Sequence, residues 1–350
     1  MRLTLLLSIL LLAACSSGNA LTSRTKDAPL NQLSEVNAKL AFTCVHEKIP
    51  APRQKRMCCF STLAGCKNNQ IQQDETVDVE IARLYRIAAE NNHYKANVNL
   101  QNGAMRGQFK LTGGERLRLS QHLINAHVAS GYYMIAIYLQ KGAAGLQQDE
   151  DMSLRYFRKA ADEGSAQAQA YVAEKLAPID IAPDVARQMR SCAASQGNGD
   201  AALALGINLS TAKEYRVALE SFQLGVAAGN EFAASFLGKG FRGPKPDNRM
   251  YYLGQEEDLE RADRYKKISD ILGNWSYANP KVPEINEIVP LPPAKLPARN
   301  GKLKWVEERE ANIPPPKPSE ALIEQLAKAM VLDPKTGRPL PGSPVYSKED

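Results

Sequence analysis

One stretch decides the fold of this chain: Tyr156-Phe-Arg-Lys-Ala-Ala-Asp-Glu-Gly-Ser-Ala-Gln-Ala-Gln-Ala-Tyr171. Its pattern is that of one helix that ends at Gly164 and of a second helix that starts directly after it. Glycine adopts the left-handed conformation at the end of a helix without steric strain, so the chain can reverse there. The stretch therefore predicts two antiparallel helices that are joined by a tight turn.

The same pattern recurs along the chain at a nearly constant period. Residues that would end a helix follow one another at steps of 39, 33, 33 and 32 positions, at Asn92, Gly131, Gly164, Gly197 and Gly229. Four positions after each of them stands a small or aliphatic residue, at Ala96, Ile135, Ala168, Ala201 and Ala233. Eight positions after each stands an aliphatic residue, at Leu100, Leu139, Val172, Leu205 and Leu237. Positions four apart share one helix face, and a period of this size is typical of stacked helix pairs, so we predict an all-α fold, an α-solenoid.

One copy of the pattern resembles a known repeat. The phrase is Gly145-Leu-Gln-Gln-Asp-Glu-Asp-Met-Ser-Leu-Arg-Tyr-Phe-Arg-Lys-Ala-Ala-Asp-Glu-Gly164, and it resembles the Sel-one-like repeat, a relative of the tetratricopeptide repeat. The resemblance covers roughly residues 80 to 240. It implies stacked helix pairs with a concave face that binds protein. The alternative is a helical domain of the same kind in which no groove is used.

The first residues have the pattern of a targeting signal. A short basic start precedes the apolar run 3–12, which is shorter than the roughly 20 residues that span a bilayer. The run ends in Leu12-Ala-Ala-Cys15, which resembles the bacterial lipobox. This resemblance implies a signal peptide over residues 1–14 and acyl chains, palmitate among them, on Cys15. The alternative is an ordinary signal peptide that is cleaved near Ala14 or Ala20.

The lipobox also implies a location. Ser16 follows the cysteine where an aspartate would favour the inner membrane, so the resemblance implies an outer-membrane anchor with the protein on the periplasmic face. Lys and Arg number 44 against 38 Asp and Glu, for a net charge of +6, and the two signs are scattered among each other. We therefore expect no nucleic-acid partner.

Composition divides the rest of the chain into segments. A polar stretch predicts a flexible tether, and the proline-rich run after residue 279 predicts an extended segment with Trp275, Ile288 and Trp305 as anchors. The predicted segments are a tether over 15–32, a cysteine-containing N-terminal cap over 33–76, helical repeats over 77–240, a C-terminal helix with a proline-rich strap over 241–332, and a mobile tail over 333–350.

Five cysteines remain after Cys15, and the periplasm favours disulfides between them. Four are disulfide candidates because they lie close together in the sequence: Cys44, Cys58, Cys59 and Cys66. The fifth, Cys192, stands on a predicted repeat helix. A loop closed by Cys44–Cys58 or by Cys44–Cys66 is expected, although spacing does not fix the connectivity. The alternative is a metal site made of Cys44, His46, Cys58 and Cys66, but its spacing fits no zinc ribbon or finger, so we predict no metal.

The sequence shows no pattern of catalytic residues. It contains no Gly-x-Ser-x-Gly, no His-Glu-x-x-His and no phosphate-binding Gly-x-x-x-x-Gly-Lys. The four histidines are His46, His93, His122 and His127, and the acidic runs 149–151 and 256–258 fall where helices would start and cap them. We therefore predict a protein that is not an enzyme and that needs no cofactor.

The C-terminal third carries a second resemblance. Three phrases carry it, Leu259-Glu-Arg-Ala-Asp-Arg-Tyr265, Asn279-Pro-Lys-Val-Pro-Glu-Ile285 and Leu291-Pro-Pro-Ala-Lys-Leu-Pro297, together with the early phrases 40–47 and 93–100. They resemble the domain of unassigned function that closes certain Sel-one-like lipoproteins of proteobacteria. Members of that group often accompany type VI secretion phospholipase effectors as their immunity proteins. The resemblance therefore implies a lipoprotein that binds and neutralises such a phospholipase.

Two other functions fit the same sequence. An envelope scaffold or adaptor would use the helical surface to bind a resident periplasmic protein. A periplasmic hydrolase is the weakest of the three, because no nucleophile and base stand together in the sequence.

Overall fold

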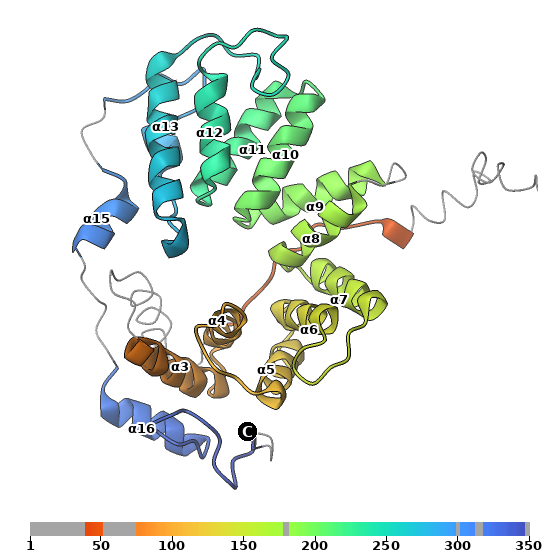
Figure 1. Ribbon diagram of the computed structural model, residues 1–350, viewed down its shortest axis with the longest axis vertical. Coiled ribbons are helices and arrows are strands. Elements are labelled where there is room, and N and C mark those ends of the chain that lie inside the picture. Colours follow the sequence, from red (N-terminus) through yellow and green to blue (C-terminus); the bar gives the residue numbers. More distant parts are fainter. Residues whose placement is uncertain (1–38, 52–74, 178–181, 299–301, 312–317, 347–350) are drawn as a thin grey trace, which may run out of the picture. The chain divides into compact units, whose positions relative to one another are not determined.

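The computed structural model describes residues 39–51, 75–177, 182–298, 302–311 and 318–346, and these ranges form an all-α fold (Figure 1). They contain no β-strand, only an isolated bridge between Leu332 and Pro339. None of the helices in these ranges has the length and apolarity needed to cross a bilayer. The predicted signal peptide, the tether and Cys15 lie outside the described residues, as do Cys58, Cys59 and Cys66.

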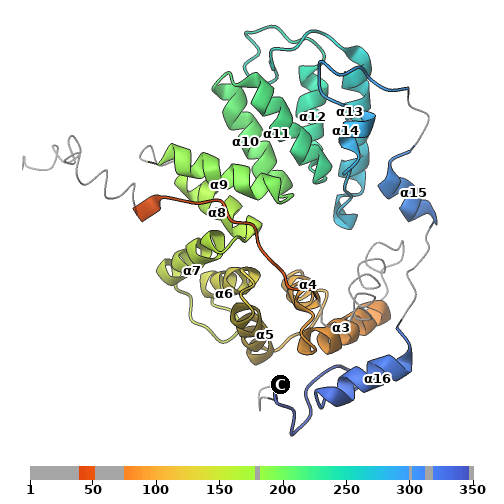
Figure 2. The ribbon, with the colours of Figure 1, turned by 180° about the vertical axis from the view of Figure 1, so that it is seen from behind.

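The repeat region is built from helices that pair in chain order (Figures 1 and 2). Each pair consists of two helices joined by a short corner, and the last helix of one pair packs on the first helix of the next from α6 onward. The pairs are α3 (Glu75–Glu90) with α4 (Tyr94–Met105), α5 (Gly113–Asn125) with α6 (Ser130–Lys141), α7 (Glu150–Asp162) with α8 (Ala166–Leu176), α9 (Pro183–Ser195) with α10 (Gly199–Thr211), and α11 (Tyr215–Ala227) with α12 (Glu231–Gly240). The predicted fold class is confirmed.

The corners within pairs share one hydrogen-bond arrangement. Gly164 ends α7 with φ 108°, and the N–H of the next residue, Ser165, donates to the carbonyl of Ala160 at 2.9 Å. The Ser165 hydroxyl then accepts from the N–H of Ala168 and caps α8. One residue thus closes the first helix and starts the second. Three other corners have the same arrangement, in which one residue donates its N–H to the preceding helix and caps the next helix with its side chain. These residues are His93, Asn198 and Asn230, and each directly follows the residue with positive φ.

The corner between α5 and α6 differs from the prediction. Gly131 does not end a helix, because it lies inside α6, and the residue with positive φ is His127, at 57°. Gly131 instead occupies the small position four residues after the turn. A Cβ on it would lie 2.7 Å from the carbonyl oxygen of Ser120 on α5, so only glycine allows the two helices this close. Ile135 then holds the aliphatic position that the sequence pattern assigned to Leu139.

The small residues of the repeat lie between helices. Ala96, Ala168, Ala201 and Ala233 are at most 3% exposed, as stacked pairs require. The aliphatic residues four positions later are buried as well: Leu100, Val172, Leu205 and Leu237. Burial of these apolar faces, which no single pair can achieve, is the main stabilising contribution to such a stack.

The proline-rich segment lies across the last helices of the repeat region. It follows α13 (Leu259–Asn274) and a short 3-10 turn (Ser276–Ala278), and it includes one short helix, α14 (Ile285–Ile288). The backbone N–H of Val282 donates to Ala227 at the end of α11, and the carbonyl of Val289 accepts from the side chain of Gln223 at 2.8 Å. Val282, Ile285 and Val289 are buried in the same core as α11 and α13. This agrees with the predicted extended segment.

The predicted anchors Trp275 and Trp305 meet each other. Trp305 stands on α15 (Lys304–Ala311), and its ring centroid lies 6.2 Å from that of Trp275. Arg309, one turn later, stacks on Trp275 at 4.3 Å and donates to the hydroxyl of Tyr277. Cation–π contacts of this kind stabilise by about 0.5–1 kcal/mol when exposed, so they attach α15 to the end of α13.

The tail differs from the prediction of a mobile segment over 333–350. Leu332 and Val345 pack into the core that α3 shares with α16 (Glu320–Ala329), and Arg83 on α3 donates to the carbonyl of Pro334 at 2.6 Å. The apolar residues Leu332 and Val345 stand so far apart in the sequence that no periodic pattern marks them. Residues 347–350 lie outside the described ranges.

The cap of α4 makes stability depend on pH. Nδ1 of His93 accepts from the N–H of Ala96 at 3.1 Å, and burial lowers the pKa of His93 below its usual value. Protonation removes the acceptor, so the unfolded chain binds the proton more readily than the folded one. We expect the free energy of unfolding to fall as the pH decreases below about 6.5, the pKa of an unfolded histidine.

Urea unfolding of the wild type and of His93→Asn between pH 7.5 and 5 checks this. Asparagine keeps the cap, as Asn198 and Asn230 do at their corners, and carries no titrating group. The variant should therefore lose less stability over this range. Some slope remains, because burial also lowers the pKa of His122, whose Nε2 lies 2.9 Å from Oδ1 of Asn92. Identical slopes for the two proteins would contradict the role of His93.

Candidate binding surface at the N-terminal strap

An extended segment near the start of the described chain crosses helices that lie far from it in sequence. We call residues 42–49 the N-terminal strap, since they adopt no helix or strand. The strap runs beside α8 and α9, and Figure 2 shows it in front of them. Its partners are residues of α6, α8 and α9, more than 80 positions away in the sequence.

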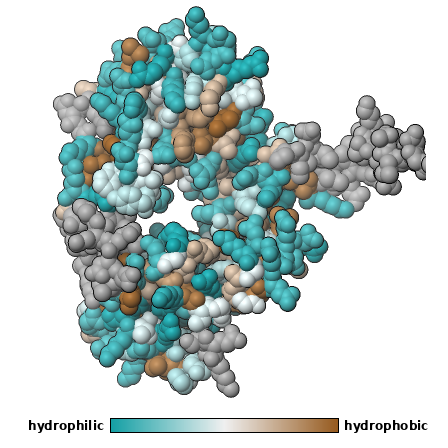
Figure 3. Space-filling view, viewed as in Figure 1, coloured by the Kyte–Doolittle hydropathy of each residue, from teal (hydrophilic) through white to brown (hydrophobic). Residues whose placement is uncertain are grey.

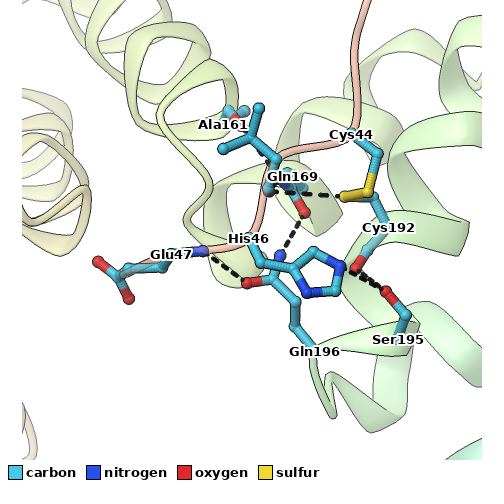
Figure 4. The surroundings of a disulfide bond; sticks show 9 residues. Cys44, His46, Glu47, Ala161, Gln169, Cys192, Ser195 and Gln196 are labelled. Carbon is cyan, nitrogen blue, oxygen red and sulfur yellow. Dashed lines mark hydrogen bonds between the residues drawn. A yellow bond between two sulfur atoms is a disulfide. The ribbon is translucent and has the colours of Figure 1, made fainter. Parts of the chain in front are cut away.

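Two glutamines hold the backbone of the strap (Figure 4). Gln169, which is fully buried, donates from Nε2 to the carbonyl of Val45 at 2.8 Å. Its Oε1 accepts from Nε2 of Gln196 at 2.9 Å, and Oε1 of Gln196 accepts from the N–H of Glu47 at 2.9 Å. The two amides therefore satisfy a donor and an acceptor of the strap as a neighbouring strand would.

The carboxylate of Glu47 caps α6, a helix that starts 83 residues later in the chain. The residue before α6, Ala129, offers no side-chain cap. Glu47 fills this place, because its Oε1 accepts from the N–H of Ser130 and its Oε2 accepts from the Ser130 hydroxyl at 3.0 Å. A carboxylate at a helix N-terminus is also favoured by the helix dipole. The strap therefore completes the start of α6.

The disulfide corrects the cysteine predictions. Cys44 of the strap is bonded to Cys192 of α9, and neither a Cys44–Cys58 nor a Cys44–Cys66 bond is present. The metal alternative of Cys44, His46, Cys58 and Cys66 also loses Cys44 as a thiolate ligand in this oxidised chain. The loop spans 148 residues, which is why proximity in the sequence pointed to the wrong partner. Cys44 is exposed, whereas Cys192 is 2% exposed.

A histidine and a serine lie together beside the disulfide, which sequence reasoning missed. Nε2 of His46 lies 3.0 Å from Oγ of Ser195 (Figure 4). Oγ of Ser195 also lies 2.8 Å from the carbonyl of Cys192, which can only accept, so the serine donates its proton there. His46 is then the donor toward Ser195, the reverse of a general base. No carboxylate among the described residues orients His46, so this pair does not form a nucleophile–base arrangement.

The strap forms one wall of a groove of about 690 Å³. Phe42, Thr43 and Cys44 line this wall, and the opposite side is made by α9, α10 and the start of α11. Arg187 and Glu214 form an ion pair at 3.1 Å across the groove lining. Leu205, Leu209 and Val217 supply its apolar floor. The groove thus has a lining of mixed apolar and charged side chains, which is typical of a protein-binding surface. It lacks the convergent polar groups that are typical of a catalytic site among the residues that line it.

Hydrophobic side chains are also exposed on α10 and α11, two of the helices that line the groove. Figure 3 shows hydrophobic colour over α10 and α11 on a surface that is otherwise largely hydrophilic. The large apolar side chains exposed on these two helices are Ile207, Val217 and Leu224, with 39%, 45% and 45% exposure. Large apolar side chains with this exposure are candidates for an interaction site.

The other residues singled out in the sequence serve the helices. His93 caps α4, His122 bonds to Asn92, and His127 ends the α5 corner. The acidic runs cap helices as predicted, with Asp149 accepting from the N–H of Met152 and Asp258 from that of Arg261. Of the four histidines, only His46 lies beside other side chains that could carry chemistry.

Comparison with known proteins supports the fold. Residues 233–340 match the family model of DUF6396, a domain of unknown function. No curated protein sequence matches the chain. Among solved structures, a protein of Pseudomonas aeruginosa, PA5086, is 25% identical with a TM-score of 0.53, over 72% of this chain and 95% of that one.

Two further solved structures are described as immunity proteins. The immunity protein Pa5087 from Pseudomonas aeruginosa is 23% identical with a TM-score of 0.54, over 72% of this chain and 95% of its own. The immunity protein PA5088 from the same organism is 24% identical with a TM-score of 0.56, over 72% of this chain and 94% of its own. The chain is thus similar in fold to immunity proteins and matches a C-terminal domain of unassigned function, which is the type of protein that the sequence phrases resembled.

Proposed function

We propose that this protein is an immunity protein that binds a toxic effector and neutralises it by covering a surface that the effector needs. The single observation that carries the proposal is the shared fold, which extends over nearly the whole length of two proteins described as immunity proteins. A binding role also suits the molecule itself. Its described part offers a mixed groove and exposed apolar side chains, and its one histidine–serine pair has the wrong direction of proton donation for nucleophilic catalysis.

We also propose the identity of the partner and the place of action. The lipobox pattern that ends at Cys15 supports a lipid-anchored protein on the periplasmic face of the outer membrane. The C-terminal phrases resemble those of proteins that accompany type VI secretion phospholipases, so the proposed effector is a phospholipase. An anchored inhibitor would stand at the membrane that such an enzyme attacks. Three acyl chains bind a bilayer far more firmly than the marginal hold of one.

The proposed contact surface is the apolar group on α10 and α11. Leu224 is 45% exposed on α11 and has no polar function to fulfil there. Interfaces depend on a few such anchors, and the loss of one removes about 2 kcal/mol or more, which corresponds to roughly 30-fold weaker binding. Leu340, which is 42% exposed in the C-terminal segment, provides a control of the same residue type and exposure.

Protection of cells from the effector tests the proposal. The proposed phospholipase effector is directed to the periplasm of a sensitive strain, with and without this protein. We expect survival with the wild type and with Leu340→Glu. Leu224→Glu should bind the purified effector about 30-fold more weakly or worse and should protect less. Cys15→Ala should leave the membrane fraction. Equal killing with and without the wild type would refute the proposed function.

A further inference from the structure

Three side chains able to bind a metal meet where the N-terminal strap crosses α9. The Sγ atoms of Cys44 and Cys192 and a ring nitrogen of His46 all lie within 4.8 Å of one another. Cys44 and His46 stand two residues apart on an extended segment, which directs both side chains to the same side. Figure 4 shows the two strap residues on the side of the strap that faces α9.

We propose that the dithiol form of this protein binds one zinc ion through Cys44, His46 and Cys192, in the place that the disulfide occupies in the oxidised form. Two thiolates and an imidazole are the donors that Zn²⁺ prefers in proteins, at about 2.3 Å for sulfur and about 2.0–2.1 Å for nitrogen. A tetrahedral ion with these bond lengths needs its two sulfur ligands about 3.8 Å apart. The atoms already within 4.8 Å therefore need only a small adjustment.

The strap can make this adjustment. Cys192 is fixed in α9 and buried, whereas Cys44 and His46 are exposed on a segment without regular structure. Nε2 of His46 lies 3.0 Å from Oγ of Ser195, and this hydroxyl keeps the carbonyl of Cys192 as its partner, so the imidazole can exchange its hydrogen bond for the ion. Exposure of Cys44 and His46 leaves the fourth ligand position to water.

The chemistry requires a reductant. A dithiol transfers two electrons and two protons to the Cys44–Cys192 bond, and the sulfur–sulfur bond breaks as a disulfide forms in the reductant. Zn²⁺ then replaces the protons of the two new thiols. The chain also has both thiols before it is first oxidised. In either redox form the strap stays joined to α9, by sulfur–sulfur bonding or through the ion.

Cobalt titration tests the site, because Co²⁺ occupies tetrahedral thiolate sites and absorbs visible light there. The full chain contains six cysteines, so C15S, C58S, C59S and C66S together leave only Cys44 and Cys192. We expect the reduced chain to saturate at one Co²⁺ with thiolate and tetrahedral bands that Zn²⁺ abolishes. The oxidised chain should show neither band.

Variants separate this site from other binding. Adding C192S should abolish the bands, and His46→Ala, on the exposed strap, should weaken binding by about tenfold or more. Ser191→Ala, at an exposed position one residue from Cys192, serves as the matched control and should bind as the parent does. A reduced parent chain without saturable bands would overturn the proposal, and so would unchanged bands in the C192S chain. Neither outcome depends on the immunity function.

Discussion

Replacing Arg86 by methionine should lower the free energy of unfolding by about 3–5 kcal/mol, the largest effect that we expect from a single substitution. Arg86 of α3 is 7% exposed, and its Nε donates to Oε1 of Glu115 on α5 at 2.7 Å. Glu115 is 3% exposed. Methionine fills a similar volume but leaves the carboxylate buried without its cation, and it also removes the donor to the carbonyl of Lys110.

Two further variants make the Arg86 test specific. Lys266→Met removes an ion pair of α13 in which both side chains are more than half exposed, so it should change stability by only about 0–0.5 kcal/mol. The double variant Arg86→Met/Glu115→Leu removes both buried charges and should recover much of the loss. Urea unfolding followed by circular dichroism measures all three. A loss of less than about 1 kcal/mol for Arg86→Met would contradict a buried pair that holds α3 to α5.

Gly164→Ala should destabilise the protein more than Gly197→Ala, although both glycines end helices with positive φ, at 108° and 84°. The left-handed conformation costs alanine about 1–2 kcal/mol at either site. At Gly197 a Cβ meets nothing within 4 Å. At Gly164 it would lie 2.6 Å from the backbone nitrogen of Glu47 and 2.7 Å from the carbonyl carbon of His46. The strap must therefore move, at a further cost of about 1–3 kcal/mol.

Hydrogen exchange shows whether this difference comes from the strap. The N–H of Ser130 is protected by the carboxylate of Glu47, so it should exchange faster in Gly164→Ala and at the wild-type rate in Gly197→Ala. Equal losses of stability for the two variants, with Ser130 unchanged in both, would mean that the close contact at Gly164 does not hold the strap.

The repeat pattern predicted the stack of helices because each helix corner is determined by residues close to one another in the sequence. A residue that can adopt positive φ and a small residue four positions later fix a corner and a close helix contact within about ten residues of chain. The error at Gly131 shows the limit of this reasoning. Glycine fits both a turn and a tight helix crossing, and the turn is made instead by His127, a residue type that adopts positive φ less often than glycine does.

The strap could not be predicted, because its contacts are long-range and not periodic. Nothing in the sequence near Glu47 marks it as the cap of a helix that starts at Ser130. The same holds for Gln169 and Gln196, which are ordinary polar residues in a helical pattern until the strap lies against them. The cysteine pairing failed for this reason too, since distance along the chain was the only guide and the partner was 148 residues away.

The position of the strap also means that one of the earliest parts of the chain to be synthesised is one of the last to reach its place in the fold. Residues 42–49 leave the ribosome before α6, α8 and α9, whose residues that bind them are synthesised more than 80 residues later. The start of α6 consequently lacks its carboxylate until the early segment folds back over finished helices. Such distant contacts form slowly, because the long intervening loop must first be closed. A chain released before residue 192 could bind the strap only through Ser130 and Gln169, without the disulfide to Cys192 or the hydrogen bond to Gln196.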